Sequence, residues 1–183
     1  MADHVCPWWG GYFIDNPLRR WLHKPERFLA PFLSPGMTVL DFGCGMGFTS
    51  IAMARLVGEE GTIISADLQP RMLQTVEKRA RRAGVAEWIR THVCQKDSLA
   101  LDRTIDFALA FWSAHEVPDL GKLLAEVHTC LVPGGEFLVV EPRGHVTPQD
   151  MAEMAAKAER AGFATTEAGP PVRWSHTTVY RKA

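Results

Sequence analysis

One stretch, residues 38–47, constrains the fold of this chain more than any other. It has the sequence T-V-L-D-F-G-C-G-M-G, and its first five residues are largely apolar, which indicates a buried parallel strand. Glycines follow at alternate positions, and the next ten residues carry apolar side chains at helical spacing. A strand, a glycine turn and a helix in direct succession predict a nucleotide-type βαβ unit, in which a ligand approaches the backbone and the helix N-terminus.

The spacing of these glycines separates the ligand classes. A dinucleotide-binding turn has the pattern G-x-G-x-x-G/A, but the sixth position counted from Gly43 is Phe48, where a small residue is needed. No G-K-S/T follows, so the turn is not a phosphate-binding loop either. The pattern present is D-x-G-x-G-x-G beginning at Asp41. The strands that follow must therefore identify the ligand.

The composition is that of an ordinary globular protein. The 183 residues suffice for one sizeable core. A net charge of −1 argues against a general nucleic-acid surface or binding to an anionic membrane, and no apolar run approaches the roughly 20 residues of a membrane span. The four cysteines form no C-x-x-C pair, and the N-terminus lacks the features of a secretory signal. We therefore expect a reduced, cytoplasmic protein.

The N-terminal segment, 1–37, differs in composition from the core at 38–183. It contains V-C-P-W-W-G-G-Y-F-I, which is dense in aromatic residues, and the pair Asn16-Pro17 predicts a helix start. We interpret the segment as a cap on a single domain that spans 1–183. Two interpretations of its aromatics stay open: a clamp that covers a face of the sheet, or a lid that excludes water from the substrate.

Strand and helix patterns alternate along the core. Strands are predicted at 38–42, 62–67, 88–93, 105–111 and 136–141, helices at about 48–57, 70–83, 118–130 and 147–161, and two short closing strands at 163–168 and 177–181. This order is typical of an α/β protein with a parallel sheet.

Four motifs, in order, resemble those of the class I S-adenosylmethionine-dependent methyltransferases. They are V-L-D-F-G-C-G-M-G, the acid in S-A-D-L, the acid in C-Q-K-D-S-L, and L-V-P-G-G-E-F-L-V-V-E-P. The resemblance covers roughly residues 38–182. It implies a doubly wound, three-layer, Rossmann-like α/β fold with seven strands, mostly parallel and closed by an antiparallel C-terminal hairpin strand. It also implies S-adenosyl-L-methionine as the cofactor.

The resemblance assigns a set of cofactor-binding residues. They are Asp41, Gly43, Cys44, Gly45, Gly47, Asp67, Leu68, Asp97, Ser98 and Phe111. Asp41 and the glycines would shape the pocket for the methionine end, Leu68 would pack on adenine, and Asp97 with Ser98 would bracket its edge. Asp67 also stands where an acid accepts the ribose hydroxyls, about 20 residues past the turn. A helix N-cap is its alternative role, and Cys44 is expected to fill space.

The segment W-S-A-H-E-V-P-D after the fourth strand stands where substrate chemistry is expected. A sulfonium methyl needs alignment and a dry site, and a hydroxyl or phenol acceptor also needs a base. His115 and Glu116 are the catalytic candidates there, and Glu141, Arg143 and His145 follow the fifth strand. His115 is the preferred base because its ordinary pKa of about 6.5 suits proton transfer, although it could instead pack or cap the loop.

The absence of certain motifs limits the classes of methyl acceptor that the sequence predicts. No N/D-P-P-Y tetrapeptide follows the fourth strand, which argues against DNA, and no carboxylate trio indicates a metal site. We therefore predict a small-molecule acceptor, no metal, and neither a DNA nor a membrane partner. Three alternatives stay open: an RNA or protein methyltransferase that uses the basic run 78–82, a non-catalytic partner protein that binds S-adenosylmethionine, and assembly into homo-oligomers.

Overall fold

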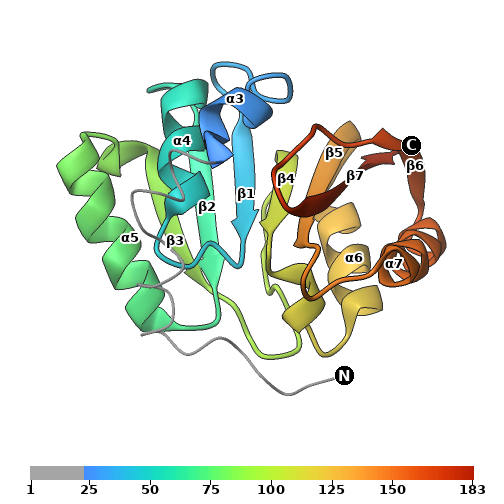
Figure 1. Cartoon of the computed structure of the whole chain (residues 1–183). Coiled ribbons are helices and arrows are strands. Elements are labelled where there is room, and N and C mark those ends of the chain that lie inside the picture. The colour runs from blue at the N-terminus through green and yellow to red at the C-terminus, as the bar shows by residue number, and fades with distance from the viewer. Residues whose placement is uncertain (1–22) are drawn as a thin grey trace.

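A seven-stranded sheet in the order β3-β2-β1-β4-β5-β7-β6 forms the centre of the computed structural model, which describes residues 23–183 (Figure 1). The strands are β1 Thr38–Phe42, β2 Thr62–Asp67, β3 Ile89–Val93, β4 Ile105–Phe111, β5 Leu131–Pro142, β6 Phe163–Ala168 and β7 Ser175–Lys182. Strands β1 to β5 pair in parallel, whereas β7 runs antiparallel to both β5 and β6. The predicted doubly wound fold with a C-terminal antiparallel strand is confirmed.

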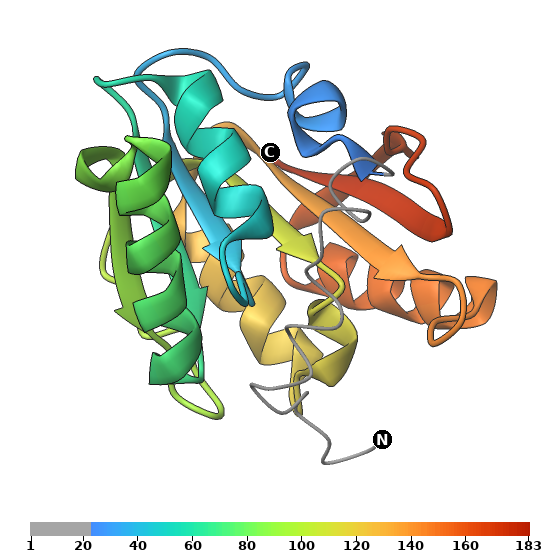
Figure 2. The same cartoon turned by 60° about the vertical axis from the view of Figure 1, so that its left-hand side comes forward.

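Helices cover both faces of the sheet (Figure 2). They are α3 Pro25–Leu29, α4 Phe48–Val57, α5 Pro70–Ala83, α6 Leu120–Cys130 and α7 Pro148–Arg160, with short 3₁₀ turns η1 Ala86–Trp88 and η2 Ala114–Glu116. One core lies between the sheet and α3, α4 and α5, and a second core lies between the sheet and α6 and α7. This is the three-layer arrangement that a doubly wound sheet requires, because both of its faces are apolar.

The order of the strands reverses between β1 and β4. From β1 the chain winds outward to β2 and β3, and then returns to place β4 on the other side of β1. In open parallel sheets such a reversal leaves a crevice at the carboxyl ends of the strands, where ligands bind. The fold therefore predicts the site between the ends of β1 and β4.

Element boundaries follow the predictions to within two residues, except at the start of β5. Strand β5 begins at Leu131 rather than 136, because the Pro-Gly-Gly turn lies within a strand that β4 already pairs, with a register shift between Ile105 and Phe107. Strand β3 begins at Ile89, since Trp88 ends the 3₁₀ turn. Helix α6 begins two residues later than predicted.

Two termini show why the helices begin where they do. The side chain of Asp119 accepts a hydrogen bond from the backbone N–H of Lys122, so Asp119 is the N-cap of α6. Thr147 and Asp150 form a reciprocal capping box at the start of α7. The helix predicted at Asn16-Pro17 lies outside the described residues. Within 23–183, no helix is both long and apolar enough to cross a membrane.

Candidate functional site

A cavity of about 1290 Å³ opens at the carboxyl ends of the parallel strands. Its walls come from the glycine turn after β1, the ends of β2 and β3, the loops after β4 and β5, and the loop before β7. Its position is the one that the strand order predicts. Of the predicted site residues, ten line this cavity: Gly43, Cys44, Gly45, Asp67, Leu68, Asp97, Ser98, Phe111, His115 and Glu116.

The glycine turn exposes bare backbone to the cavity. Gly43 and Gly45 have φ angles of 64° and 52°, in the left-handed region that favours glycine. A Cβ at Gly43 would lie 2.3 Å from the Cβ of Ser113, so a side chain at this position would clash with the loop after β4. A Cβ at Gly45 would meet no protein atom within 4 Å. The turn is therefore pressed against the β4 loop on one side and open toward the cavity on the other.

Asp67 is held at the end of β2 by two backbone donors. Its Oδ2 accepts the N–H of Gly45 at 2.9 Å, and its Oδ1 accepts the N–H of Gln69 at 2.9 Å. A carboxylate has about four acceptor sites, so Asp67 retains the capacity to accept a ligand hydroxyl. Burial raises the pKa of Asp67, against the lowering effect of these backbone N–H groups. The N-cap of α5 is Gln69, so the alternative capping role of Asp67 is not observed.

Asp41 and Gly47, which were predicted to shape the cofactor pocket, do not themselves line the cavity. Asp41 is 1% exposed, and its carboxylate accepts hydrogen bonds from the hydroxyls of Thr49 and Ser50 on α4. Burial raises the pKa of Asp41 to about 6, despite these hydroxyl donors. A Cβ at Gly47 would lie 3.2 Å from Val76 of α5. Both residues therefore support the turn from the protein side.

A second carboxylate, missed in the sequence, organises the loop after β3. Glu126 of α6 accepts the hydroxyl of Ser98 at 2.8 Å and the N–H of Leu99 at 2.5 Å. The Ser98 hydroxyl thus points at Glu126. Asp97 lies at the rim with a 75% exposed side chain, 3.8 Å from the ammonium of Lys122. No local motif marks Glu126, because it lies 28 residues from Ser98 on an otherwise ordinary amphipathic helix.

Leu68 and Cys44 give the cofactor half an apolar lining. Leu68 is 37% exposed and faces the cavity, as a residue that packs on a flat base would. Cys44 is 6% exposed, and burial raises the pKa of its thiol well above the usual value. A buried neutral thiol agrees with the space-filling role. Cys94 also lines this half, a position for which the sequence carried no signal.

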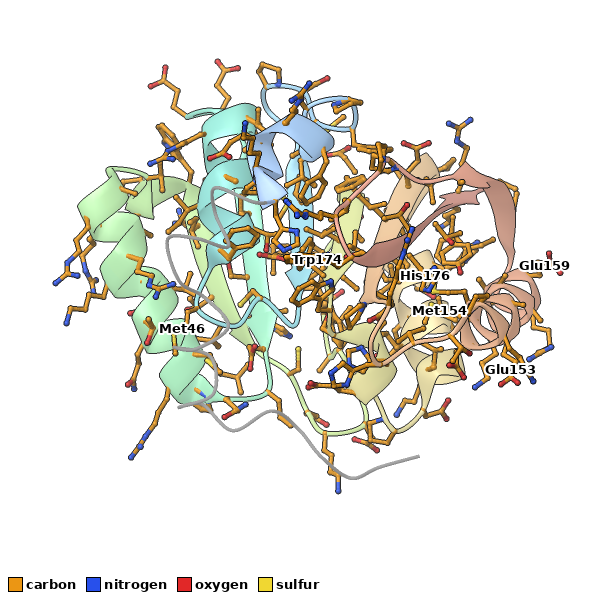
Figure 3. The ribbon with its side chains drawn as sticks, viewed as in Figure 1. Met46, Glu153, Met154, Glu159, Trp174 and His176 are labelled. Carbon is orange, nitrogen blue, oxygen red and sulfur yellow. The ribbon has the colours of Figure 1, made fainter. Side chains whose placement is uncertain are left out.

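Aromatic side chains form the wall between β4 and β7. Phe111 stacks on Phe28 and on Trp112, with ring centroids 5.8 and 5.3 Å apart. The indole N–H of Trp112 donates to Ser175 at 3.0 Å. Trp174 is 55% exposed, and its φ of 57° is in the left-handed region that side chains other than glycine rarely adopt. In Figure 3, Trp174 lies over the middle of the sheet.

His115 is tied to the end of β5 by two hydrogen bonds. Its backbone N–H donates to Oε1 of Glu141 at 3.1 Å, and its ring Nδ1 lies 2.6 Å from Oε2 of the same carboxylate. Glu141 is completely buried, whereas the His115 side chain is 24% exposed. A carboxylate only accepts, so Nδ1 carries the hydrogen and Nε2 of the neutral ring is the free acceptor.

The electrostatics around His115 favour its protonated form. Burial alone would lower the pKa of His115, but the hydrogen bond and charge of Glu141, together with the charge of Glu116, outweigh burial and raise it. His145, after β5, also lines the cavity, with its ring centroid 6.0 Å from that of His115. The structure therefore brings together catalytic candidates from the loop after β4 and the loop after β5.

No set of three or more His, Cys, Asp or Glu residues within 23–183 is arranged to hold a metal ion. The basic run on α5 is partly engaged within the protein, because Arg79 donates to the carbonyl of Met46 at 3.1 Å and Arg81 lies 3.9 Å from Glu77. Met46, beside α5 in Figure 3, lies in the glycine turn. One arginine of the run therefore supports the cofactor half.

Comparison with known proteins decides the family. A family model described as a methyltransferase domain matches residues 33–175. The chain belongs to this methyltransferase family. The sequence-based resemblance to class I enzymes is thus confirmed, and S-adenosyl-L-methionine is the methyl donor of that class. The cavity fits this group, because bare backbone at Gly45 and an oriented carboxylate at Asp67 face it from adjacent strand ends.

Solved structures show the same fold. A SAM-dependent methyltransferase from Aquifex aeolicus superposes with a TM-score of 0.86 at 23% identity, covering 98% of this chain and 100% of that one. A putative O-methyltransferase from Nostoc punctiforme superposes with a TM-score of 0.77 at 21% identity, covering 96% and 60%. The ubiquinone/menaquinone biosynthesis C-methyltransferase UbiE of Escherichia coli is 33% identical over 107 residues, 58% of this chain. The match spans 43% of that curated relative.

Proposed function

We propose that this protein transfers the methyl group of S-adenosyl-L-methionine to a hydroxyl of a small molecule, with His115 as the general base. The observation that carries the proposal is that Nε2 of His115 is free in the cavity that the glycine turn and Asp67 also line. The bound donor supplies an activated methyl group, so the protein has to align the acceptor, exclude water and accept one proton.

The two ends of the cavity divide these tasks. Asp67 and the backbone of Gly45 hold the donor, with Leu68 against its base and Asp97 at its edge. His115 and Glu116 face the acceptor from the loop after β4. A cavity of about 1290 Å³ has room for the donor and a small molecule, and the partial use of the α5 basic run within the protein gives less support to an RNA acceptor.

Calorimetric titration with S-adenosylhomocysteine tests the donor site. Asp67→Ala removes a carboxylate that accepts ribose hydroxyls, so affinity should fall by about 1.5–3 kcal/mol. Asp102→Ala, an exposed acid outside the cavity, is the matched control and should bind as the wild type does. Unchanged affinity in Asp67→Ala would exclude this residue from the donor site.

Transfer of radiolabelled methyl groups into fractionated cell extract tests the acceptor class. We expect label in small metabolites. Label in RNA or protein would replace the proposal with a macromolecular acceptor, and label in no fraction would support a non-catalytic binding protein.

A further inference from the structure

We infer that the acceptor is a phenol without anionic substituents, and that Glu141 is the positioning residue that directs Nε2 of His115 toward its hydroxyl. The inference rests on the proposed methyl transfer and names its substrate class. Three features of the cavity support the inference: the two hydrogen bonds between Glu141 and His115, the aromatic wall, and the charge of the lining residues.

Glu141 controls His115 through both of its oxygens. One oxygen accepts the backbone N–H and the other binds ring Nδ1, so the loop and the ring orientation are set by one carboxylate. That carboxylate is completely buried at the carboxyl end of β5, where the backbone of Glu141 lies opposite His176 in the antiparallel ladder with β7. A ring held at Nδ1 has only Nε2 left to accept a proton. The arrangement is therefore directional, as a base that serves one fixed hydroxyl needs to be.

The charged and titratable groups around this pair define what the base can do. Glu116 adds negative charge from the same loop, and His145 faces the ring from the loop after β5. Tyr180 of β7 is close enough for Glu141 to affect it, and burial raises its pKa to about 12, so it remains neutral. The result is an imidazole somewhat more basic than usual. The pKa of such an imidazole lies much closer to that of a phenol, about 10, than to that of an aliphatic alcohol, so it suits proton transfer from a phenol.

The aromatic wall suits a flat ring. Trp112 and Trp174 line the cavity together with Phe111, and His115 lines it on the same side of the sheet reversal. Trp174 keeps a large apolar surface exposed in a left-handed conformation, with the guanidinium of Arg173 stacked 4.6 Å from its ring centroid. Aromatic faces of this kind gain most from stacking or edge contacts with another ring.

The charge of the lining opposes anions. Among the described residues that line the cavity there are one lysine, Lys96, and six carboxylates: Asp67, Asp97, Glu116, Asp119, Glu126 and Asp150. No arginine of the described part of the chain lines it. An acceptor with a carboxylate or phosphate would enter against this field, whereas a neutral or cationic one would not.

The phenol, the methyl donor and His115 together account for every bond, electron pair and proton in the methyl transfer. The phenol oxygen forms a bond to the methyl carbon while the carbon–sulfur bond breaks and leaves its electron pair on sulfur. The phenol proton passes to Nε2 of His115, and later to solvent. The products are an aryl methyl ether, the neutral thioether and one proton.

A matched series of phenols tests the substrate class. Tyrosol, tyramine and 4-hydroxyphenylacetate present the same ring and hydroxyl with a neutral, cationic or anionic tail. We expect methylation of the first two, with kcat/KM about tenfold or more above that of the acetate. Equal or faster transfer to the acetate would overturn the charge argument. If none of the three is methylated while label still enters extract metabolites, the phenol assignment is wrong and the proposed function stands.

Glu141→Gln tests the positioning role, with Glu136→Gln as its control. Glu136 lies on the same strand and binds Arg181 at 2.6 Å outside the cavity. In Glu141→Gln we expect kcat to fall at least tenfold with little change in KM, and the rise of kcat with pH to move to lower pH. A ring-fluorinated tyrosol, with a more acidic hydroxyl, should recover part of the loss.

Proton NMR of the free protein supplies a readout independent of activity. The pKa of His115 should fall in Glu141→Gln and stay unchanged in Glu136→Gln. If Glu141 acted only on folding, its substitution would lower methyl transfer to tyrosol and to fluorinated tyrosol equally and would leave the pKa of His115 unchanged. Either of those results would overturn the role assigned to Glu141.

Discussion

The two halves of the cavity are built in different ways. The cofactor half comes from consecutive strand ends, where backbone N–H groups of the glycine turn and of α5 orient Asp67. The acceptor half is assembled by contacts between the loop after β4 and the strands β5 and β7: the indole N–H of Trp112 donates to Ser175 of β7, and His115 is bound by Glu141 of β5. The first half therefore contains the glycine motif, whereas no local sequence motif marks the second. Substitutions that act on one half alone test this division.

Gly43→Ala should have the largest effect, because this residue lies where the halves touch. A methyl group there would overlap Ser113 at 2.3 Å and would also sit in a left-handed conformation. We expect a loss of about 3–4 kcal/mol in the free energy of unfolding, from overpacking plus backbone strain. Chemical denaturation measures this loss, and calorimetry with S-adenosylhomocysteine should show weakened binding.

Gly84→Ala is the matched control. Its φ of 72° and ψ of 25° are left-handed, but a Cβ there meets no atom within 4 Å. It should cost only the backbone strain, about 1–2 kcal/mol, and should leave cofactor affinity unchanged. Equal losses in both variants would mean that contact with Ser113 does not matter.

Asp41→Asn should change the pH dependence of stability within the cofactor half. The pKa of Asp41 is raised from 3.8 to about 6 in the folded protein. Folding therefore favours the protonated carboxyl, and this contribution is complete below about pH 4 and is lost as the pH rises through 6. The variant cannot ionise, so its stability relative to the wild type should increase by about 2–3 kcal/mol between pH 4 and 7. Denaturation curves at each pH measure it, and a constant difference would contradict the prediction.

Trp174→Ala should have the smallest effect, confined to the acceptor half. Removing one face of the aromatic wall should cost about 1 kcal/mol of acceptor binding free energy, which raises KM for the acceptor roughly fivefold, with cofactor affinity unchanged. Val93→Ala, another exposed apolar residue that lies outside the cavity, should alter neither. A weaker affinity for S-adenosylhomocysteine in Trp174→Ala would show that the indole belongs to the donor site.

The division also explains what the sequence could predict. Strands β1, β2 and β4 and helix α5 were predicted with their observed bounds, because apolar periodicity and terminal Pro and Gly residues are local signals. Asp67 was assigned in the same way, from its distance to the turn, and it lines the cavity. The burial of the Asp41 side chain against α4 was not predictable, since a motif specifies a residue but not the direction in which its side chain points.

Tertiary contacts account for the rest. Glu126 sits on a helix whose sequence shows only amphipathic spacing, and its bonds to Ser98 and Leu99 depend on how α6 packs. Glu141 was a candidate by position, but its hydrogen bonds to the backbone N–H and the ring Nδ1 of His115 depend on the register of β5 beside β4. The left-handed Trp112 and Trp174 carry no sequence signal, because such conformations are imposed by surrounding structure.

The contact of Ser113 with the glycine turn limits how this enzyme can be redesigned. Its hydroxyl donates to the carbonyl of Phe42 at 2.9 Å, and its Cβ fills the space that Gly43 leaves. The segment that carries His115 is thus fixed to the glycine turn, so substitutions within this segment will also affect the binding of the methyl donor. Within residues 23–183, the exposed loop with Trp174 makes no hydrogen bond to the glycine turn. New acceptor preferences are therefore best sought by varying that loop.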